Sequence, residues 1–169
     1  MSADWYSGHP AIVTGTGMSI RQQITEALKE AQKAQDRCTT GTLRLVCAAM
    51  KDRDIAARTN GAGNPIPDEQ ILELLAKMVK QREEAAEQFR AGDRSELADK
   101  EEAEIVVIRR FMPQQLSHDD VEAAVDYVIA EIEATGLKDM GRVMAALKAG
   151  YPGQIDGGMA SALVKQRLA

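Results

Sequence analysis

The residues best suited to chemistry in this chain are basic side chains near its C-terminal end. Residues 138–169 carry five basic and two acidic residues, whereas residues 113–137 carry six acidic residues and no lysine or arginine. The basic residues are Lys138, Arg142, Lys148, Lys165 and Arg167. Cations that share one surface can neutralise the phosphates of a nucleic acid. The same side chains promote solubility and complement helix dipoles, and the sequence gives these two roles equal weight.

The spacing of these cations predicts that they are exposed together. Lys138 and Arg142 are four residues apart and therefore share a helix face, away from the apolar residues between them. The turn at residues 153–158 contains three glycines, and the backbone N–H groups of such a turn can approach a phosphate closely. We therefore predict eight RNA-binding residues, the five cations together with Gly153, Gly157 and Gly158. Asp156 is expected to cap the last helix rather than bind a ligand.

Catalytic and metal-binding chemistry finds little support in the residue types. Cys38 and Cys47 are the only cysteines and form no CxxC motif, and His9 and His118 are the only histidines, so a zinc site is not expected. Cys47 falls on an apolar helix face, where a buried structural thiol is expected. The sequence also lacks a P-loop and a Ser-Lys constellation. We therefore expect no catalytic residues, no bound metal and no cofactor.

Length and composition predict an all-α protein. The 169 residues suffice for one ordinary domain or two small ones, and helix-forming residues dominate while aromatic residues make up only 4%. The net charge of −5 excludes a globally basic, nonspecific nucleic-acid binder but permits a local basic patch. No segment approaches the roughly 18 apolar residues of a membrane span, and no secretory signal is visible. We expect a cytoplasmic protein without membrane contact.

Hydrophobic periodicity predicts four helices before Pro113, with Ser19 as the cap of the first. The others are expected at Gly41–Arg58, at Pro67 to about Ala91, and at Asp93–Arg110 with Asp93 as its cap. The third helix would be nearly 40 Å long at about 1.5 Å per residue, which favours an elongated hairpin with the fourth.

Pro113 ends this region, and the charge pattern changes there, so we place a domain boundary at this residue. Three shorter helices are expected after it, capped by Ser117, Asp139 and Asp156, with Gly136 ending the first. The predicted organisation is a disordered or loosely docked arm at 1–17, an N-terminal helical domain at 18–112 and a three-helix domain at 113–169.

Two C-terminal segments resemble the GatB/YqeY family. They are FMPQQLS at 111–117 and LKDMGRVMAALKAGYPGQIDGGMASALVKQRL at 137–168. The preceding KQREEAAEQFRAGDRSELADKEEAEI resembles the stand-alone YqeY proteins, not the amidotransferase B subunit, which carries a large catalytic body in that place. The resemblance covers about Met18 to the end. The chain departs from the family pattern at 149–152, where many members have lysines and this sequence reads Ala-Gly-Tyr-Pro.

The resemblance implies an all-helical protein and a function, by analogy with the amidotransferase B subunit, whose equivalent tail contacts transfer RNA. The expected function is a non-catalytic accessory protein that contacts transfer RNA weakly through residues 113–169. A second hypothesis is an adaptor that binds an aminoacyl-tRNA synthetase or an amidotransferase without touching RNA. The third is a carbon–nitrogen ligase with glutamine as amide donor, the enzyme class to which the family is assigned by shared domain.

Overall fold

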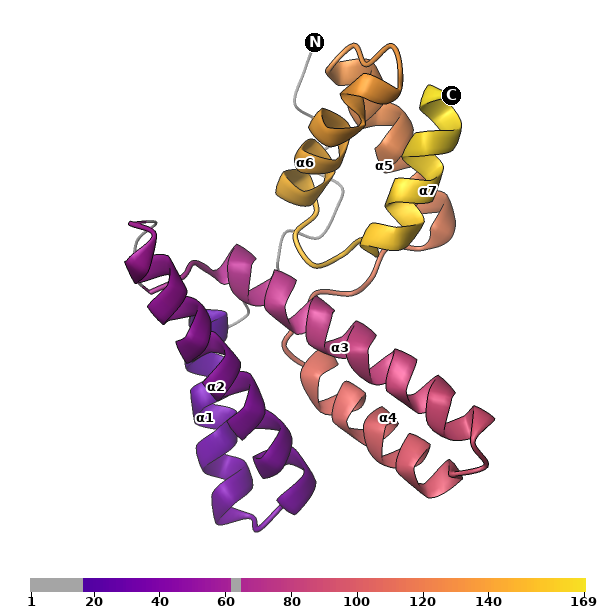
Figure 1. Cartoon of the computed structure of the whole chain (residues 1–169). Helices are drawn as coiled ribbons and strands as arrows, with labels where there is room; N and C mark the ends of the chain where they lie inside the picture. Colours follow the sequence, from indigo (N-terminus) through magenta and orange to yellow (C-terminus); the bar gives the residue numbers. More distant parts are fainter. Residues whose placement is uncertain (1–16, 62–64) are drawn as a thin grey trace.

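The computed structural model describes residues 17–61 and 65–169, and these residues form helices and no strand (Figure 1). The first four helices are α1 (Ile20–Lys33), α2 (Arg37–Thr59), α3 (Asp68–Ala91) and α4 (Ser95–Arg109). After them come α5 (His118–Glu131), the short 3-10 turn η2 (Leu137–Asp139), α6 (Met140–Gly150) and α7 (Gly157–Leu168). The all-α prediction is confirmed. Except for Gly17, the predicted arm lies outside the described residues.

The N-terminal unit, residues 17–112, consists of two antiparallel hairpins, α1 with α2 and α3 with α4. The hairpins meet near the start of α3 and diverge toward their loops (Figure 1). Their shared core contains fully buried aliphatic side chains from α1, α2, α3 and α4. The largest of these are Ile24, Leu43, Ile71, Leu72, Leu75 and Ile108. The predicted elongated α3–α4 hairpin is thus present.

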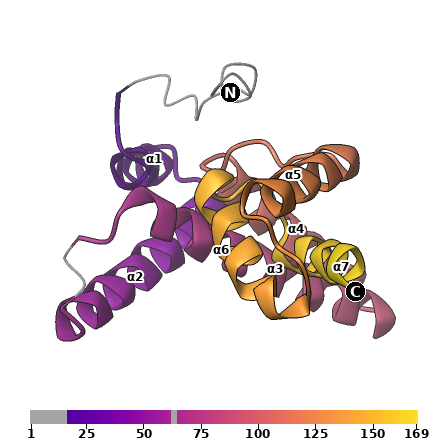
Figure 2. The same cartoon turned by 90° about the horizontal axis from the view of Figure 1, so that it is seen from above.

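The tail, residues 113–169, has a hydrophobic core of its own. α5, α6 and α7 pack against one another and bury residues including Val121, Val125, Val143, Leu147 and Val164. The tail lies beside α3, with the chain passing from α4 into α5 through a short linker (Figures 1 and 2). None of the side chains in this core belongs to the core of the N-terminal unit. Independent folding of the tail stays a prediction, tested below.

One carboxylate connects three segments of the N-terminal unit. Asp54 of α2 accepts two hydrogen bonds from the Arg21 guanidinium of α1, at 2.9 and 3.0 Å. The same carboxylate accepts the Ile66 backbone N–H at 3.0 Å, which fixes the segment that leads into α3. Partial burial by itself would raise the pKa of Asp54, but the Ile66 N–H and Arg21 outweigh it and hold the pKa below its ordinary value.

Two helix starts differ from the prediction. α2 begins at Arg37, four residues before the expected Gly41, because Asp36 caps it: its Oδ1 accepts the Thr39 N–H at 3.0 Å. The Thr39 hydroxyl also donates to Asp36, and both bonds lower the pKa of that carboxyl. Asp93 was expected to cap the fourth helix, but its φ is +55°, and α4 begins at Ser95 without a side-chain cap.

Three helices end on a left-handed residue that is not glycine. Gln35, Asp93 and Glu133 have φ values between 52° and 57° and follow α1, α3 and α5. In each case the next residue donates its N–H to the carbonyl five residues back, which is the Schellman arrangement. This ending places the C-terminus of α5 at Glu131, so the prediction that Gly136 ends this helix was wrong.

Candidate nucleic-acid interface

Two of the five predicted cations of the tail are engaged by carboxylates. Arg142 Nη1 lies 3.1 Å from Asp139 Oδ1, and its Nη2 donates to the Ile132 carbonyl at 3.3 Å. Asp139 was expected to cap α6, but its other oxygen accepts the Thr135 N–H, upstream of the helix. That backbone bond, with Arg142, lowers the pKa of Asp139. The charge of Arg142 is therefore partly neutralised.

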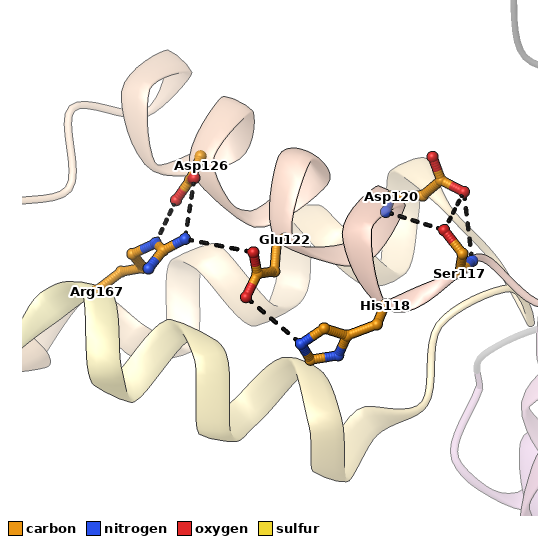
Figure 3. Close-up of polar contacts among 6 residues, drawn as sticks. All are labelled: Ser117, His118, Asp120, Glu122, Asp126 and Arg167. Carbon is orange, nitrogen blue, oxygen red and sulfur yellow. Dashed lines mark hydrogen bonds and ion pairs between the residues drawn. The ribbon is translucent and has the colours of Figure 1, made fainter.

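Arg167 is paired with the acidic helix α5 (Figure 3). Its Nε lies 2.7 Å from Asp126 Oδ1, and its Nη2 lies 3.3 Å from Asp126 Oδ2 and 3.9 Å from Glu122 Oε2. The bond to Asp126 raises the pKa of Arg167. The guanidinium therefore joins α7 to α5, and its charge is largely balanced there.

The start of α5 lies at the other end of the same polar cluster (Figure 3). Ser117 caps the helix and forms a capping box with Asp120, as predicted from their spacing. His118 is exposed, and its Nε2 lies 3.4 Å from Glu122 Oε1. This is the geometry of a solvated residue in a first helical turn.

The remaining predicted cations are lysines that form no ion pair with any residue the structure describes. Lys138 lies in η2, Lys148 near the end of α6 and Lys165 near the end of α7, and all three are exposed. Of these, Lys148 lies where the tail meets the N-terminal unit. The surface around Lys148 is therefore the best candidate for a nucleic-acid interface.

The α3–tail groove, with a volume of about 280 Å³, lies between α3 and the tail. Its apolar lining comes from Ala76, Met144, Leu147, Tyr151, Pro152, Ile155 and Ala160. Its charged lining comes from Arg53, Glu69, Glu73, Lys77 and Lys148. Within the described ranges, none of these five charged side chains forms an ion pair. Three cations from α2, α3 and α6 are thus gathered at one concave surface.

Gly153 sets how closely the tail approaches α3. Its φ is +72°, and a Cβ added to it would lie only 3.1 Å from Leu72 Cβ. The loop is also bonded to the linker: Gln115 Nε2 donates to the Gly153 carbonyl at 2.6 Å, and the Leu116 N–H donates to the Gln154 carbonyl at 2.9 Å. A side chain at position 153 would therefore be strained twice, by its dihedral angle and by contact with Leu72.

A second hollow, of about 430 Å³, adjoins the groove along α3. Lys80, Arg109 and the N-terminus of α7 at Gly157 and Gly158 contribute to it, and Lys77 lines both hollows. Asp156 caps α7 as predicted, since its Oδ1 accepts the Met159 N–H at 2.7 Å. Its carboxylate also faces this hollow and opposes binding of an anion there.

The predicted RNA-binding residues fall into three groups. The first group lines the α3–tail groove and comprises Lys148, Gly153 and Gly157. The second is Gly158 alone, which lines only the adjoining hollow. The third group lines neither hollow and comprises Lys138, Arg142, Lys165 and Arg167. Sequence reasoning missed Arg53, Lys77 and Tyr151. Nothing local in the sequence marks them, because they come together only when the tail packs on α3.

The part of the chain that the structure describes contains no cluster of histidine, cysteine and carboxylate side chains able to hold a metal ion. Among the described helices, none has an apolar stretch of the length needed to cross a membrane. Cys47 is half-buried, and burial raises the pKa of its thiol, as for a structural cysteine.

Residues 21–168 match the Yqey-like protein family. The chain belongs to this family. The match spans both units, from α1 to the end of α7, so the α3–tail groove lies within the Yqey-like region. The family assignment agrees with the YqeY part of the sequence resemblance.

Several fungal proteins are similar to this Yqey-like chain. An uncharacterized protein of Schizosaccharomyces pombe is 29% identical over 101 residues, which cover 59% of this chain and 77% of the relative. The "altered inheritance of mitochondria protein 41, mitochondrial" of Lachancea thermotolerans is 28% identical over 65% of this chain and 58% of its own. The protein of the same name from Saccharomyces cerevisiae is 28% identical over 64% of this chain and 54% of its own length. The chain thus spans little more than half of these two mitochondrial relatives.

Proposed function

We propose that this chain is a non-catalytic accessory protein that contacts transfer RNA with its tail and the adjoining face of α3. The observation that carries the proposal is the meeting of Arg53, Lys77 and Lys148 at the α3–tail groove. Cations without protein carboxylate partners are available to replace the counterions of a phosphate backbone. Lys138 and Lys165, which are exposed on the same tail, extend the set of available charges.

The charge distribution makes the expected affinity weak and sensitive to salt. The chain carries a net charge of −5, and Arg142 and Arg167 are already balanced by carboxylates. About five cations then remain for phosphate contact, and each adds about one to the slope of log K against log salt. Transfer RNA is the proposed ligand by analogy with the amidotransferase B subunit, whose equivalent tail contacts transfer RNA.

The test compares two triple variants of equal charge. The first, R53Q/K77Q/K148Q, removes the groove cations; the second, R44Q/K51Q/K100Q, removes one arginine and two lysines of α2 and α4 that are exposed and form no ion pair with any described residue. Binding of bulk transfer RNA is measured by fluorescence anisotropy at low and moderate salt. The groove variant is expected to lose affinity and to reduce the salt slope by about one for each phosphate contact that it loses, whereas the control variant should change neither. Equal affinities of the two variants at every salt concentration would contradict the proposal.

A protein-binding role is favoured by a different surface. Leu45 and Ile55 of α2 are 55% and 60% exposed, with the exposed Ala48 between them. Exposed apolar side chains mark a protein docking face when they form a contiguous patch, and we expect these residues of α2 to form one. The expected partner is an amidotransferase or an aminoacyl-tRNA synthetase. Surface plasmon resonance with such a purified enzyme tests this role, and L45E/I55E should abolish binding if α2 is the docking face.

A further inference from the structure

The α3–tail groove combines an aromatic side chain, an apolar floor and cations that form no ion pair with any described residue. Tyr151 and Pro152 line it from the loop after α6, and Met144 and Leu147 line it from α6 itself. Lys77 stands on the α3 side. An apolar surface alone would suit many ligands, and a row of cations alone would suit any polyanion. The combination suits a ligand with a flat apolar part and an attached anion.

We propose that this groove binds one unpaired nucleotide, with its base against Tyr151 and its phosphate against Lys77 and Lys148. This inference rests on the proposed RNA function and deepens it, because it names which part of an RNA enters the groove. Unpaired bases can be turned out of a strand and stacked on aromatic side chains, whereas bases in a duplex are held in their own stack.

The size of the groove favours a single nucleotide. Its volume of about 280 Å³ lies at the lower end of small-molecule clefts, which span roughly 300–1,000 Å³. A group the size of one base and its ribose is therefore the appropriate occupant. A longer run of stacked bases would have to lie outside the groove.

The charge of the groove also favours one phosphate. Arg53, Lys77 and Lys148 contribute three positive charges, and Glu69 and Glu73 contribute two negative ones. The net charge of the lining is then about +1. This charge is enough to attract one phosphate, but it would not balance several consecutive phosphates of a strand. The carboxylates lie on the first turns of α3, whereas Lys77 lies one turn farther along the same helix. The phosphate is accordingly expected beside Lys77.

The experiment compares unpaired and paired RNA with the full-length protein. Fluorescein-labelled oligoadenylate and a duplex of equal length are titrated at one salt concentration, and dissociation constants are read from anisotropy. The wild-type protein is expected to bind oligoadenylate more tightly than the duplex. Y151A is expected to weaken oligoadenylate binding by about tenfold, since loss of one base–aromatic stack has an effect of this order, and to leave duplex binding unchanged.

Three further variants separate stacking from folding. Y151F keeps the ring and should bind oligoadenylate like the wild type. Y127A removes an exposed tyrosine on α5, outside the groove lining, and should also have no effect. A76L enlarges one lining residue and narrows the groove while keeping Tyr151 and the three cations, and it should weaken oligoadenylate binding even if Y151A proves unstable by circular dichroism.

The outcomes distinguish this inference from the proposed function. If both RNAs bind alike and neither Y151A nor A76L changes the affinity for oligoadenylate, the nucleotide groove is overturned while RNA contact stands. If neither RNA shows salt-sensitive binding to the wild-type protein, both proposals are overturned. If Y127A weakens oligoadenylate binding as much as Y151A, the base does not sit in the groove and the inference also fails.

Discussion

Arg82 and Glu104 form a 3.0 Å ion pair between α3 and α4 with only 12% and 16% of their side chains exposed. In the tail, by contrast, the 2.7 Å pair of Arg167 and Asp126 is 37% and 53% exposed. Partly buried pairs are costly to break, whereas solvent screens exposed ones. The Arg82–Glu104 pair therefore contributes more to holding α3 to α4 than the Arg167–Asp126 pair contributes to holding α7 to α5.

The sharpest test of this comparison is to separate the two regions. A fragment of residues 113–169 is expected to be helical and to melt cooperatively, because its core is drawn entirely from α5, α6 and α7. Its stability should be low, since domains of about 60 residues bury a smaller fraction of their surface than larger ones. Circular dichroism against temperature measures both properties.

A core substitution in the fragment provides the control. Leu147 is 1% exposed, so L147A should cost about 2–5 kcal/mol and abolish the cooperative melt. A fragment with little helix, or one that melts identically with and without L147A, would show that the tail depends on α3 and that the two regions are one folding unit.

A smaller effect is expected from the carboxylate that joins three segments of the N-terminal unit. D54A should destabilise this unit by about 2–3 kcal/mol, because it leaves Arg21 without its partner and the Ile66 N–H without its acceptor. D126A, which removes an exposed partner of Arg167 in the tail, should cost much less. Urea unfolding of the two variants measures the difference, and equal losses would contradict the contrast between the regions.

Acid should weaken the N-terminal unit through the same group. The pKa of Asp54 is lowered in the folded protein, so its contribution is present above the ordinary aspartate pKa of about 3.9 and is lost as pH falls through the folded pKa. D54N cannot titrate and should flatten the decline in stability below about pH 4. Urea unfolding midpoints measured between neutral and acid pH report this decline in stability. Parallel curves of midpoint against pH for the wild type and D54N would exclude this role of Asp54.

The smallest effect is a gain in stability at a helix end. Gln35 holds a φ of +57° after α1, a region that glycine enters without the steric cost of a Cβ. Q35G should therefore stabilise the N-terminal unit by about 1 kcal/mol. The greater conformational entropy of glycine in the unfolded chain reduces this gain. Thermal unfolding measures the change. A lower melting temperature for Q35G would mean that the entropy gained by the unfolded chain outweighs the relief of steric strain in the folded protein.

Features set by neighbouring residues could be predicted from the sequence. Ser117 with Asp120, and Asp156 with the N–H three residues later, were predicted as caps and form the expected bonds. Asp93 was predicted as a cap and is instead the left-handed residue that ends α3. An aspartate before a polar helix start is compatible with both roles, and only the backbone angle separates them.

Features that depend on packing between distant segments could not be predicted. Lys77 lines the α3–tail groove, and its position among the charged residues of α3 does not mark it for this role. The spacing of Lys138 and Arg142 predicted one shared helix face, whereas Lys138 belongs to a separate 3-10 turn. Tyr151 carries no periodic signal, because it follows the last residue of α6 in an irregular loop.

The contact of Gly153 with Leu72 has a mechanical consequence for the tail. The loop rests on α3 at this point, and its bonds to Gln115 and Leu116 join it to the start of the tail. The same loop leads into Ile155 and Gly157, which line both hollows. A ligand in one hollow would therefore press on a segment that also forms the wall of the other, so this loop would couple the occupancy of the two hollows.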